Sequence, residues 1–259
     1  MDKDSSNPYP MVTIITVTYN AEKYLEKTIQ SILAQSYPYI EYLIVDGKSS
    51  DGTLAIIQHY ASSISAWISE EDQGIYDAMN KALAMAQGDY VWFMNAGDEI
   101  YAPDTLEKMM QNAGSADIYY GETLYITPAG EAIGLRSEVT PLKLPAQLTW
   151  RDLRYGLMVC HQSIIVGREL AVPYDLQHPY SADIDWVIRC LKQAGWVVNT
   201  GMVLARYRQG GFSRQHLGRS LSDRFKILQK HYGFFSNLLN HSYIVSRSLR
   251  YLLIKRRKY

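Results

Sequence analysis

The sequence predicts an α/β fold built on a mostly parallel sheet. Short apolar runs rich in β-branched residues are typical of strands buried on both faces, and they alternate with segments whose apolar side chains recur at helical spacing. Alternation at this spacing is typical of βαβ units. The composition, with 47% hydrophobic and 20% charged residues among 259, is that of a globular protein. A chain of this length can bury a full core.

The first hundred residues supply the strands and helices of this sheet. After the first strand, Asn20 is expected to cap the first helix with its side chain. Gly88 is expected to follow the third helix in the left-handed conformation that glycine adopts readily. We expect strands over residues 12–17, 42–45, 66–68 and 90–94, and helices over residues 25–33, 53–60 and 75–86.

The rest of the chain is less regular and is expected to complete a site on the sheet. Residues 118–134 are expected to form short antiparallel strands around a turn at Ala129-Gly130, and residues 141–150 a loop. Helical periodicity predicts further helices over residues 183–194, 217–232 and 243–258. The expected organisation is an N-terminal extension (1–10), one domain (11–215) made of a nucleotide-binding half (11–115) and a second half (116–215), and a helical tail (216–259).

The formal net charge of zero hides an asymmetry along the chain. Residues 1–223 carry 17 cations and 26 acidic side chains, whereas the segment after Asp223 carries nine cations and no acidic residue. An acidic body with a basic tail indicates that the tail meets an anionic partner. Nucleic acid is disfavoured as that partner, because the acidic body would repel a polyanion.

Cysteine usage and hydropathy favour a chain that stays inside the cell. Cys160 and Cys190 have no metal-ligand spacing and allow a single disulfide, which favours a reducing compartment. Because the strongly apolar runs are only about six residues long, no transmembrane helix is expected. Residues 1–4 include acids where a signal peptide starts with basic residues, so none is expected.

Polar side chains follow each predicted strand at its carboxyl end, where parallel sheets bind ligands. The four segments are Thr18-Tyr19-Asn20, Asp46, Ser69-Glu70-Glu71-Asp72 and Asn95-Ala96-Gly97-Asp98. Taken singly, such residues are common in loops and helix caps. Together they offer carboxylates for a Mg²⁺ or Mn²⁺ ion that holds a diphosphate, and a tyrosine ring that can stack on a base. The first loop lacks the glycine-rich phosphate motifs, so the predicted ligand is a nucleoside diphosphate with a metal ion.

Several motifs carry a family resemblance. Residues 12–20 and 44–53 resemble the opening of the family 2 inverting glycosyltransferases of the GT-A fold. Residues 71–81 and 88–98 resemble the bacterial surface-polysaccharide branch of that family, including its colanic-acid-type enzymes. Three shorter motifs, at residues 160–163, 181–186 and 210–213, are similar to later motifs of that branch. The resemblance implies a GT-A domain with a nucleotide-sugar half and an acceptor half.

The resemblance also implies roles for the residues that would bind the nucleotide-sugar. Tyr19 would lie against the base and Asp46 would bond to it. The metal motif of the family reads Asn95-Ala96-Gly97-Asp98 here and keeps one carboxylate, so Asp98 would hold a weakened Mn²⁺ or Mg²⁺ site. The implied donor-binding set is Thr18, Tyr19, Asn20, Asp46, Asp72, Asp77, Asn80, Lys81, Asn95, Ala96, Gly97 and Asp98.

For catalysis the resemblance implies a single in-line displacement at the anomeric carbon. Asp183 matches the position of the catalytic base, although it can also cap its helix, and Ala182 stands where the family has a glutamate. General-base assistance contributes about 10²–10⁴-fold to a rate. Residues expected to contact the acceptor or the diphosphate are His161, Gln162, Asp185, Arg206, Arg208, Gly211, Ser213 and Arg214.

In the branch that the chain resembles, the acceptor is usually a sugar on a polyprenyl diphosphate in the inner membrane. Residues 246–259 carry six cations, no acid and an apolar face, which is typical of a helix at an anionic membrane surface. The expected location is therefore cytoplasmic and peripheral, on the inner face of the cell membrane. A solvated terminal helix is the simpler alternative for this segment.

Two other functions remain as alternatives at this point. One is a sugar nucleotidyltransferase, which usually carries a glycine- and arginine-rich phosphate loop after the first strand, where this chain has Tyr19-Asn20-Ala21-Glu22-Lys23. The other is a catalytically silent scaffold that binds a nucleotide-sugar.

Overall fold

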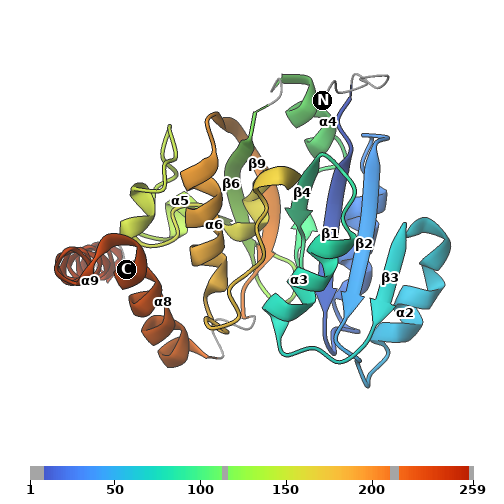
Figure 1. Cartoon of the computed structure of the whole chain (residues 1–259), viewed down its shortest axis with the longest axis horizontal. Coiled ribbons are helices and arrows are strands. Elements are labelled where there is room, and N and C mark those ends of the chain that lie inside the picture. Colours follow the sequence, from blue (N-terminus) through green and yellow to red (C-terminus); the bar gives the residue numbers. More distant parts are fainter. Residues whose placement is uncertain (1–8, 113–115, 211–215, 257–259) are drawn as a thin grey trace.

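The strands that the structure describes form one mixed sheet with helices on both faces (Figure 1). The computed structural model describes residues 9–112, 116–210 and 216–256. Over these residues the strand order is β3-β2-β1-β4-β8-β6-β9-β5, and β7 pairs with β6. The predicted α/β class is confirmed. The strands are β1 (Val12–Thr18), β2 (Ile40–Asp46), β3 (Ala66–Ser69), β4 (Tyr90–Phe93), β5 (Glu99–Ile100), β6 (Ile118–Ile126), β7 (Ala132–Leu135), β8 (Ile164–Gly167) and β9 (Val197–Arg208).

Five helices follow the predicted ranges to within two residues. The last helix differs, because it begins at Phe234 and not near residue 243, and the helix over Thr105–Asn112 was not predicted. The α-helices are α1 (Leu25–Leu33), α2 (Thr53–His59), α3 (Ile75–Met85), α4 (Thr105–Asn112), α5 (Arg136–Val139), α6 (Ala182–Gln193), α8 (Leu217–Tyr232) and α9 (Phe234–Arg256). Short 3₁₀ turns are η1 (Ala61–Ser63), η2 (Asp152–Tyr155), η3 (His161–Ser163) and η4 (Arg168–Leu170).

The parallel part of the sheet is its best predicted region. β1 pairs in parallel with both β2 and β4, and β2 pairs in parallel with β3. Side chains such as Val17 pack on one face with α3 and α6, and those such as Ile14 pack on the other with α1, α2 and α4. Because both faces are covered, every residue of β1 is buried, which explains its continuous apolar run.

The second half adds antiparallel strands and returns to the first half. β8 pairs antiparallel with both β4 and β6, β9 runs parallel to β6, and β5 pairs antiparallel with β9. The antiparallel strands expected over residues 118–134 are confirmed as β6 and β7. The β6–β9 register shifts beside Gly121, where a Cβ atom would lie 2.5 Å from the carbonyl oxygen of Met202. A side chain at that position would force the two strands apart.

Two local predictions were wrong. Asn20 does not cap α1, whose N-cap is Tyr24. The backbone of Asn20 has φ 47°, and its side-chain Oδ1 accepts a hydrogen bond from Ser50 N at 2.9 Å. Asn20 therefore links the loops after β1 and β2. Gly88 is not left-handed either. A Cβ there would lie 2.8 Å from both Met11 O and Thr13 N, so the position needs glycine because the chain passes close to β1.

The two C-terminal helices lie at one end of the molecule (Figure 1). α8 packs on α6, and its buried Ile227 and Leu228 join the apolar cluster that contains Val187. α9 packs on α8 and on η2. Over the described residues, no helix combines the length and the apolar character needed to cross a bilayer.

Candidate active site

A cavity of about 1640 Å³ lies at the carboxyl ends of β1 and β4. Its walls come from the loops after these strands, from the N-terminal turns of α3 and α6, and from α8 and α9. Sites for one small ligand usually measure about 300–1,000 Å³. The cavity therefore has room for two ligands at once.

One end of the cavity is lined by the segment after β1. Thr18, Tyr19 and Asn20 lie there, and the Tyr19 ring is 66% exposed, so its face is open to a planar ligand. Asp72 lines the same end. Gly47 makes this arrangement possible, because a Cβ atom at Gly47 would contact the Asp72 carboxylate and lie 3.4 Å from Tyr19 Cδ2.

Four residues predicted at the donor site do not line the cavity. Asp46 is fully buried and its Oδ2 accepts hydrogen bonds from Ser69 Oγ at 2.7 Å and from Ser49 N at 3.0 Å. It therefore fixes the loop after β2. The other three lie on α3 and fix neighbouring segments: Asp77 bonds to Gln73 N, Asn80 to the backbone of Tyr174, and Lys81 to Glu70.

Asp98 lies in the floor of the cavity and is 5% exposed. Its Oδ1 accepts a hydrogen bond from Arg208 N at 3.0 Å, and burial raises its pKa to about 7. The Arg208 guanidinium donates to Gly97 O and Glu99 Oε1, each at 2.9 Å, and lies 5.1 Å from the Tyr24 ring centre. Arg208 thereby holds the turn that presents Asp98.

The motif at residues 95–98 offers a limited set of oxygen ligands for a metal ion. All four of its residues line the cavity, and Asn95 Oδ1 is buried without a hydrogen-bond partner among the described residues. Over all the residues that the structure describes, no group of three or more histidine, cysteine or acidic side chains could hold a metal. Asn95 and Asp98 fit a divalent cation only if a bound ligand supplies further oxygens.

Asp183 lies in the first turn of α6, and the N-cap of that helix is Ser181. Its carboxylate lines the cavity and accepts a hydrogen bond from Tyr76 Oη at 3.2 Å. Burial and, next, the charge of Asp183 raise the pKa of Tyr76 well above its usual range, so this phenol remains a donor. Tyr76 stacks on Tyr174 and so gives Asp183 a fixed orientation in the cavity.

His161 and Gln162 lie in η3 and line the cavity wall. His161 Nε2 lies 2.7 Å from Tyr174 Oη, and its ring packs against Phe93 and Trp186. Burial lowers the pKa of His161 to about 4, so the ring is neutral at neutral pH. It is therefore part of an aromatic cluster that supports the cavity.

Other predicted residues do not line the cavity. Asp185 is fully buried on the far side of α6, where it pairs with Arg189 and His231. Burial alone would raise its pKa, but hydrogen bonds from His231 and Arg189 hold the pKa well below its usual range. The guanidinium of Arg206 lies over the ring of Tyr101 at 5.6 Å. The predicted residues Gly211, Ser213 and Arg214 lie outside the described residues.

Three arginines on α5, α8 and α9 that were not predicted at the site also line the cavity: Arg136, Arg224 and Arg247. Arg224 and Arg247 belong to the basic tail, whose charge was predicted to face a membrane. For Arg224 the available signal was its spacing of three and four residues from the buried Ile227 and Leu228. Arg247 gave none, because it lies opposite the apolar side of α9, which faces outward. Arg136 gave no signal, because it lies in a short helix without a recognisable pattern.

Comparison with known proteins identifies the family. Residues 13–172, well over half of the chain, match Glycosyl transferase family 2. The chain belongs to this family. This family 2 glycosyltransferase has the residues of the family opening, Thr18 to Asn20 among them, at one end of the cavity, and the predicted base Asp183 in the same cavity.

Curated relatives of this glycosyltransferase span most of its length. It is 31% identical over 229 residues to the PGL/p-HBAD biosynthesis glycosyltransferase of Mycobacterium bovis, which covers 84% of this chain and 85% of the relative. It is 34% identical over 167 residues to TuaG of Bacillus subtilis, a glycosyltransferase named for teichuronic acid biosynthesis, with 63% of this chain and 65% of TuaG covered.

Solved structures show the same GT-A fold. S. aureus TarS, residues 1–349, in complex with UDP has a TM-score of 0.64 at 17% identity, covering 84% of this glycosyltransferase and 64% of the TarS chain. The mannosyltransferase PcManGT from Pyrobaculum calidifontis, in complex with GDP-Man and Mn²⁺, has a TM-score of 0.61 at 18% identity. There the match covers 93% of this chain and 77% of that one.

Proposed function

We propose that this glycosyltransferase moves a sugar, with inversion, from a nucleoside-diphosphate donor to a hydroxyl of a lipid-linked glycan in surface polysaccharide biosynthesis. One observation carries this proposal: Tyr19, Asp98 and Asp183 line a single cavity that is large enough for a donor and an acceptor. The teichuronic acid assignment of TuaG supports the polysaccharide part.

The donor would occupy the end of the cavity next to β1. The open face of Tyr19 suits a nucleobase, and the Asp72 carboxylate can accept hydrogen bonds from it or from the ribose. Two structural neighbours, TarS and PcManGT, were solved in complex with UDP and with GDP-Man, which supports a nucleoside-diphosphate donor.

A divalent cation would be held by Asp98 and Asn95, with the donor diphosphate completing its ligand set. Bound Mn²⁺ or Mg²⁺ supplies Lewis-acid stabilisation of the charge that develops on a leaving diphosphate. The protein itself contributes the Arg208 guanidinium, which holds the turn around Asp98 at the same place.

The acceptor hydroxyl would approach Asp183 from the side of α8 and α9. Asp183 takes the hydroxyl proton as the oxygen attacks the anomeric carbon and the bond to the diphosphate oxygen breaks. Tyr76 keeps the carboxylate oriented through its hydrogen bond to Oδ1. A base on the acceptor side and a leaving group at Asp98 favour direct displacement with inversion.

A panel of sugar nucleotides tests the donor. We expect one member of a UDP-, GDP- and dTDP-sugar panel, with Mn²⁺ or Mg²⁺ present, to raise the melting temperature and to yield free nucleoside diphosphate. A ligand at 100 times its dissociation constant adds about 2.7 kcal/mol to stability. Exchange of pyrophosphate into the sugar nucleotide would instead identify a nucleotidyltransferase, and no stabilisation by any member would contradict the proposal.

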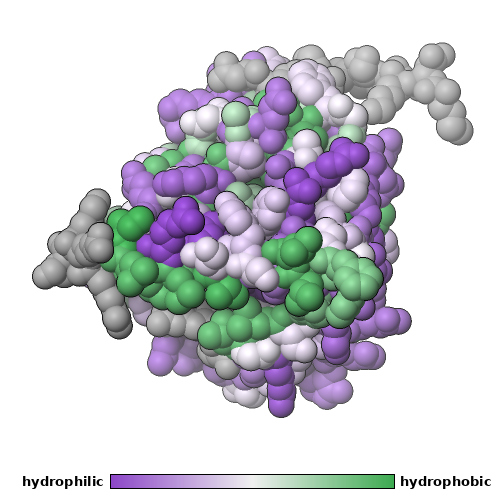
Figure 2. Space-filling view, turned by 90° about the vertical axis from the view of Figure 1, so that its left-hand side faces the viewer, coloured by the Kyte–Doolittle hydropathy of each residue, from purple (hydrophilic) through white to green (hydrophobic). Residues whose placement is uncertain are grey.

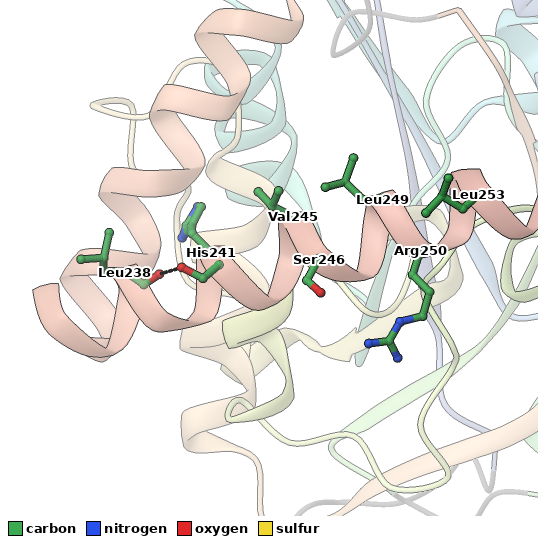
Figure 3. A pocket seen from close by; sticks show the side chains of 8 residues that line it. Leu238, His241, Val245, Ser246, Leu249, Arg250 and Leu253 are labelled. Carbon is green, nitrogen blue, oxygen red and sulfur yellow. Dashed lines mark hydrogen bonds between the residues drawn. The ribbon is translucent and has the colours of Figure 1, made fainter.

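α9 would attach the enzyme to a membrane, because its polar residues face the protein and its apolar residues face outward. The inward residues Asn237 and Asn240 are buried, and Asn237 Nδ2 bonds to Phe225 O at 3.0 Å. Exposed apolar side chains cover the outer side, namely Phe235, Leu238, Leu239, Val245, Leu249, Leu252 and Leu253. Figure 3 shows Val245, Leu249 and Leu253 projecting from one side of the helix, along a groove of about 760 Å³, and Figure 2 shows hydrophobic surface on this end of the molecule. A helix whose apolar side faces outward suits the boundary of a lipid layer.

Leu249→Asp with Leu253→Asp is expected to weaken binding to phosphatidylcholine–phosphatidylglycerol vesicles by about tenfold or more. The reason is that each leucine loses about 1.5–3 kcal/mol of apolar transfer energy. Co-sedimentation measures this, and Leu33→Asp, an exposed leucine at the end of α1, is the matched control. If the double variant sediments with vesicles as well as the control does, the membrane assignment of α9 is wrong.

A further inference from the structure

Three buried or half-buried arginines from separate elements line the cavity, and two of them, Arg136 and Arg247, are close enough for their charges to interact. Arg136 comes from α5, Arg224 from α8 and Arg247 from α9. Arg136 is 6% exposed and donates to the carbonyl oxygens of Leu157 and Met158. Among the described residues, no carboxylate forms an ion pair with any of the three.

These guanidinium groups retain unused donors. Nε of Arg224 and Nε of Arg247 are both buried, and neither has a hydrogen-bond partner among the described residues. Burial and, with it, the nearby charge of Arg136 lower the pKa of Arg247, while Tyr243 acts in the opposite direction. Arg247 donates one hydrogen bond to Tyr155 O at 2.8 Å, and the two buried Nε groups remain able to donate to an anion in the cavity.

The cluster lies between the predicted base and the apolar end of the molecule. Arg224 is close enough to Tyr76, the partner of Asp183, for its charge to lower the Tyr76 pKa in part. Beyond the arginines the cavity wall is apolar, with Leu221 and Val245 among its residues. Both side chains are also more than half exposed on the outside, so the wall continues into the outer face of α8 and α9.

We propose that Arg136, Arg224 and Arg247 bind the phosphate ester of a lipid-linked acceptor, which enters between α8 and α9 with its hydrocarbon chain on the apolar outer face. The inference rests on the proposed function and names the group of the acceptor that is recognised. Guanidinium groups suit phosphate oxygens because two of their N–H groups can bind at once. Anchoring the phosphate here would leave the sugar hydroxyl of the acceptor to reach Asp183.

Binding of soluble probes to the full chain tests the site. The donor end is first filled with saturating UDP or GDP, whichever stabilises the protein, and farnesyl diphosphate and inorganic diphosphate are then titrated by calorimetry. Farnesyl diphosphate is expected to bind at least tenfold more tightly than inorganic diphosphate. Arg224→Gln, which removes no hydrogen bond of the described structure, is expected to weaken both by about tenfold or more. Lys226→Gln, an exposed cation on α8, is the matched control.

Four outcomes overturn the inference. The first is unchanged farnesyl diphosphate affinity in Arg224→Gln, and the second is an equal loss of affinity in Lys226→Gln. The third is a loss of UDP or GDP affinity in Arg224→Gln, which would assign the arginine to the donor. The fourth is equal affinity of the wild type for the two diphosphates, which would exclude recognition of the lipid. Donor binding and sugar transfer by the wild type are measured separately, so failure here is distinct from failure of the proposed function.

Discussion

Asp183→Asn is expected to lower the turnover number by about 10²–10⁴-fold and to leave affinity for the sugar nucleotide nearly unchanged. The amide has the shape of the carboxylate and can still accept the hydrogen bond of Tyr76, but it cannot take a proton from the acceptor. Donor affinity depends on the opposite end of the cavity, where Tyr19 and Asp72 lie. Steady-state kinetics with separate calorimetry of donor binding measures the two effects.

Two further variants make this result specific. Glu169→Gln makes the same change of charge at an exposed position away from the cavity and is expected to behave as wild type. Tyr76→Phe removes the hydrogen bond that orients Asp183 and is expected to cause a smaller loss of turnover. Near-normal turnover in Asp183→Asn would exclude this residue as the base.

Asp98→Asn is expected to have two opposite effects. Turnover should fall by about 10²-fold or more, because the leaving diphosphate loses the charged group that would hold its cation. The folded protein without metal, in contrast, should become more stable at pH 8 by about 1–4 kcal/mol, since the variant no longer buries an ionised carboxylate. Kinetics and denaturant unfolding in a chelating buffer measure the two effects.

The pKa of Asp98 determines how the stability gained in Asp98→Asn depends on pH. Burial raises the pKa of Asp98 from 3.8 to about 7, so the folded protein binds this proton more tightly than the unfolded chain does. The associated stability is present below about pH 4 and is lost as the pH rises through 7. The advantage of Asp98→Asn should therefore be small near pH 4 and full by pH 8. An advantage that is the same at both pH values would contradict the assigned titration.

The strands of the parallel part were predicted from short apolar runs, and β6 and β7 from strand-like segments on either side of a turn. β8 was not predicted, although its residues Ile164, Ile165 and Val166 are buried. β9 was not predicted, because most of its residues are only half-buried and its apolar runs are short and separated by Asn199, Thr200 and Gly201. β5 has two residues and is defined by its pairing with Arg206 and Ala205, which are distant in the sequence. The left-handed conformation predicted for Gly88 was wrong. Glycine is needed there because the chain passes close to β1, and this tertiary contact cannot be inferred from the residues at a helix end.

The same distinction applies to the cavity. Tyr19 and Asp98, in the loops after β1 and β4, lie in it because parallel strands deliver their ends to one edge. Asp46, at the end of β2, was predicted by the same argument but is buried in hydrogen bonds to its own loop and to Ser69. Asp77 and Asn80 lie on a helix, where the direction of a side chain depends on how the helix packs, and they support neighbouring segments instead. The arginines of α8 and α9 reach the cavity only because these helices fold back over it.

The pairing of β5 with β9 means that the halves of this enzyme are interleaved. A stretch of chain from before residue 115 forms the far edge of the sheet, beyond strands contributed from after it. In a chimera that takes the residues before 115 from one relative and those after it from another, both the β4–β8 and the β5–β9 pair would combine strands from different proteins. Evolution of new acceptor preferences is therefore expected to proceed by exchange of loops and of the last two helices, not of whole halves.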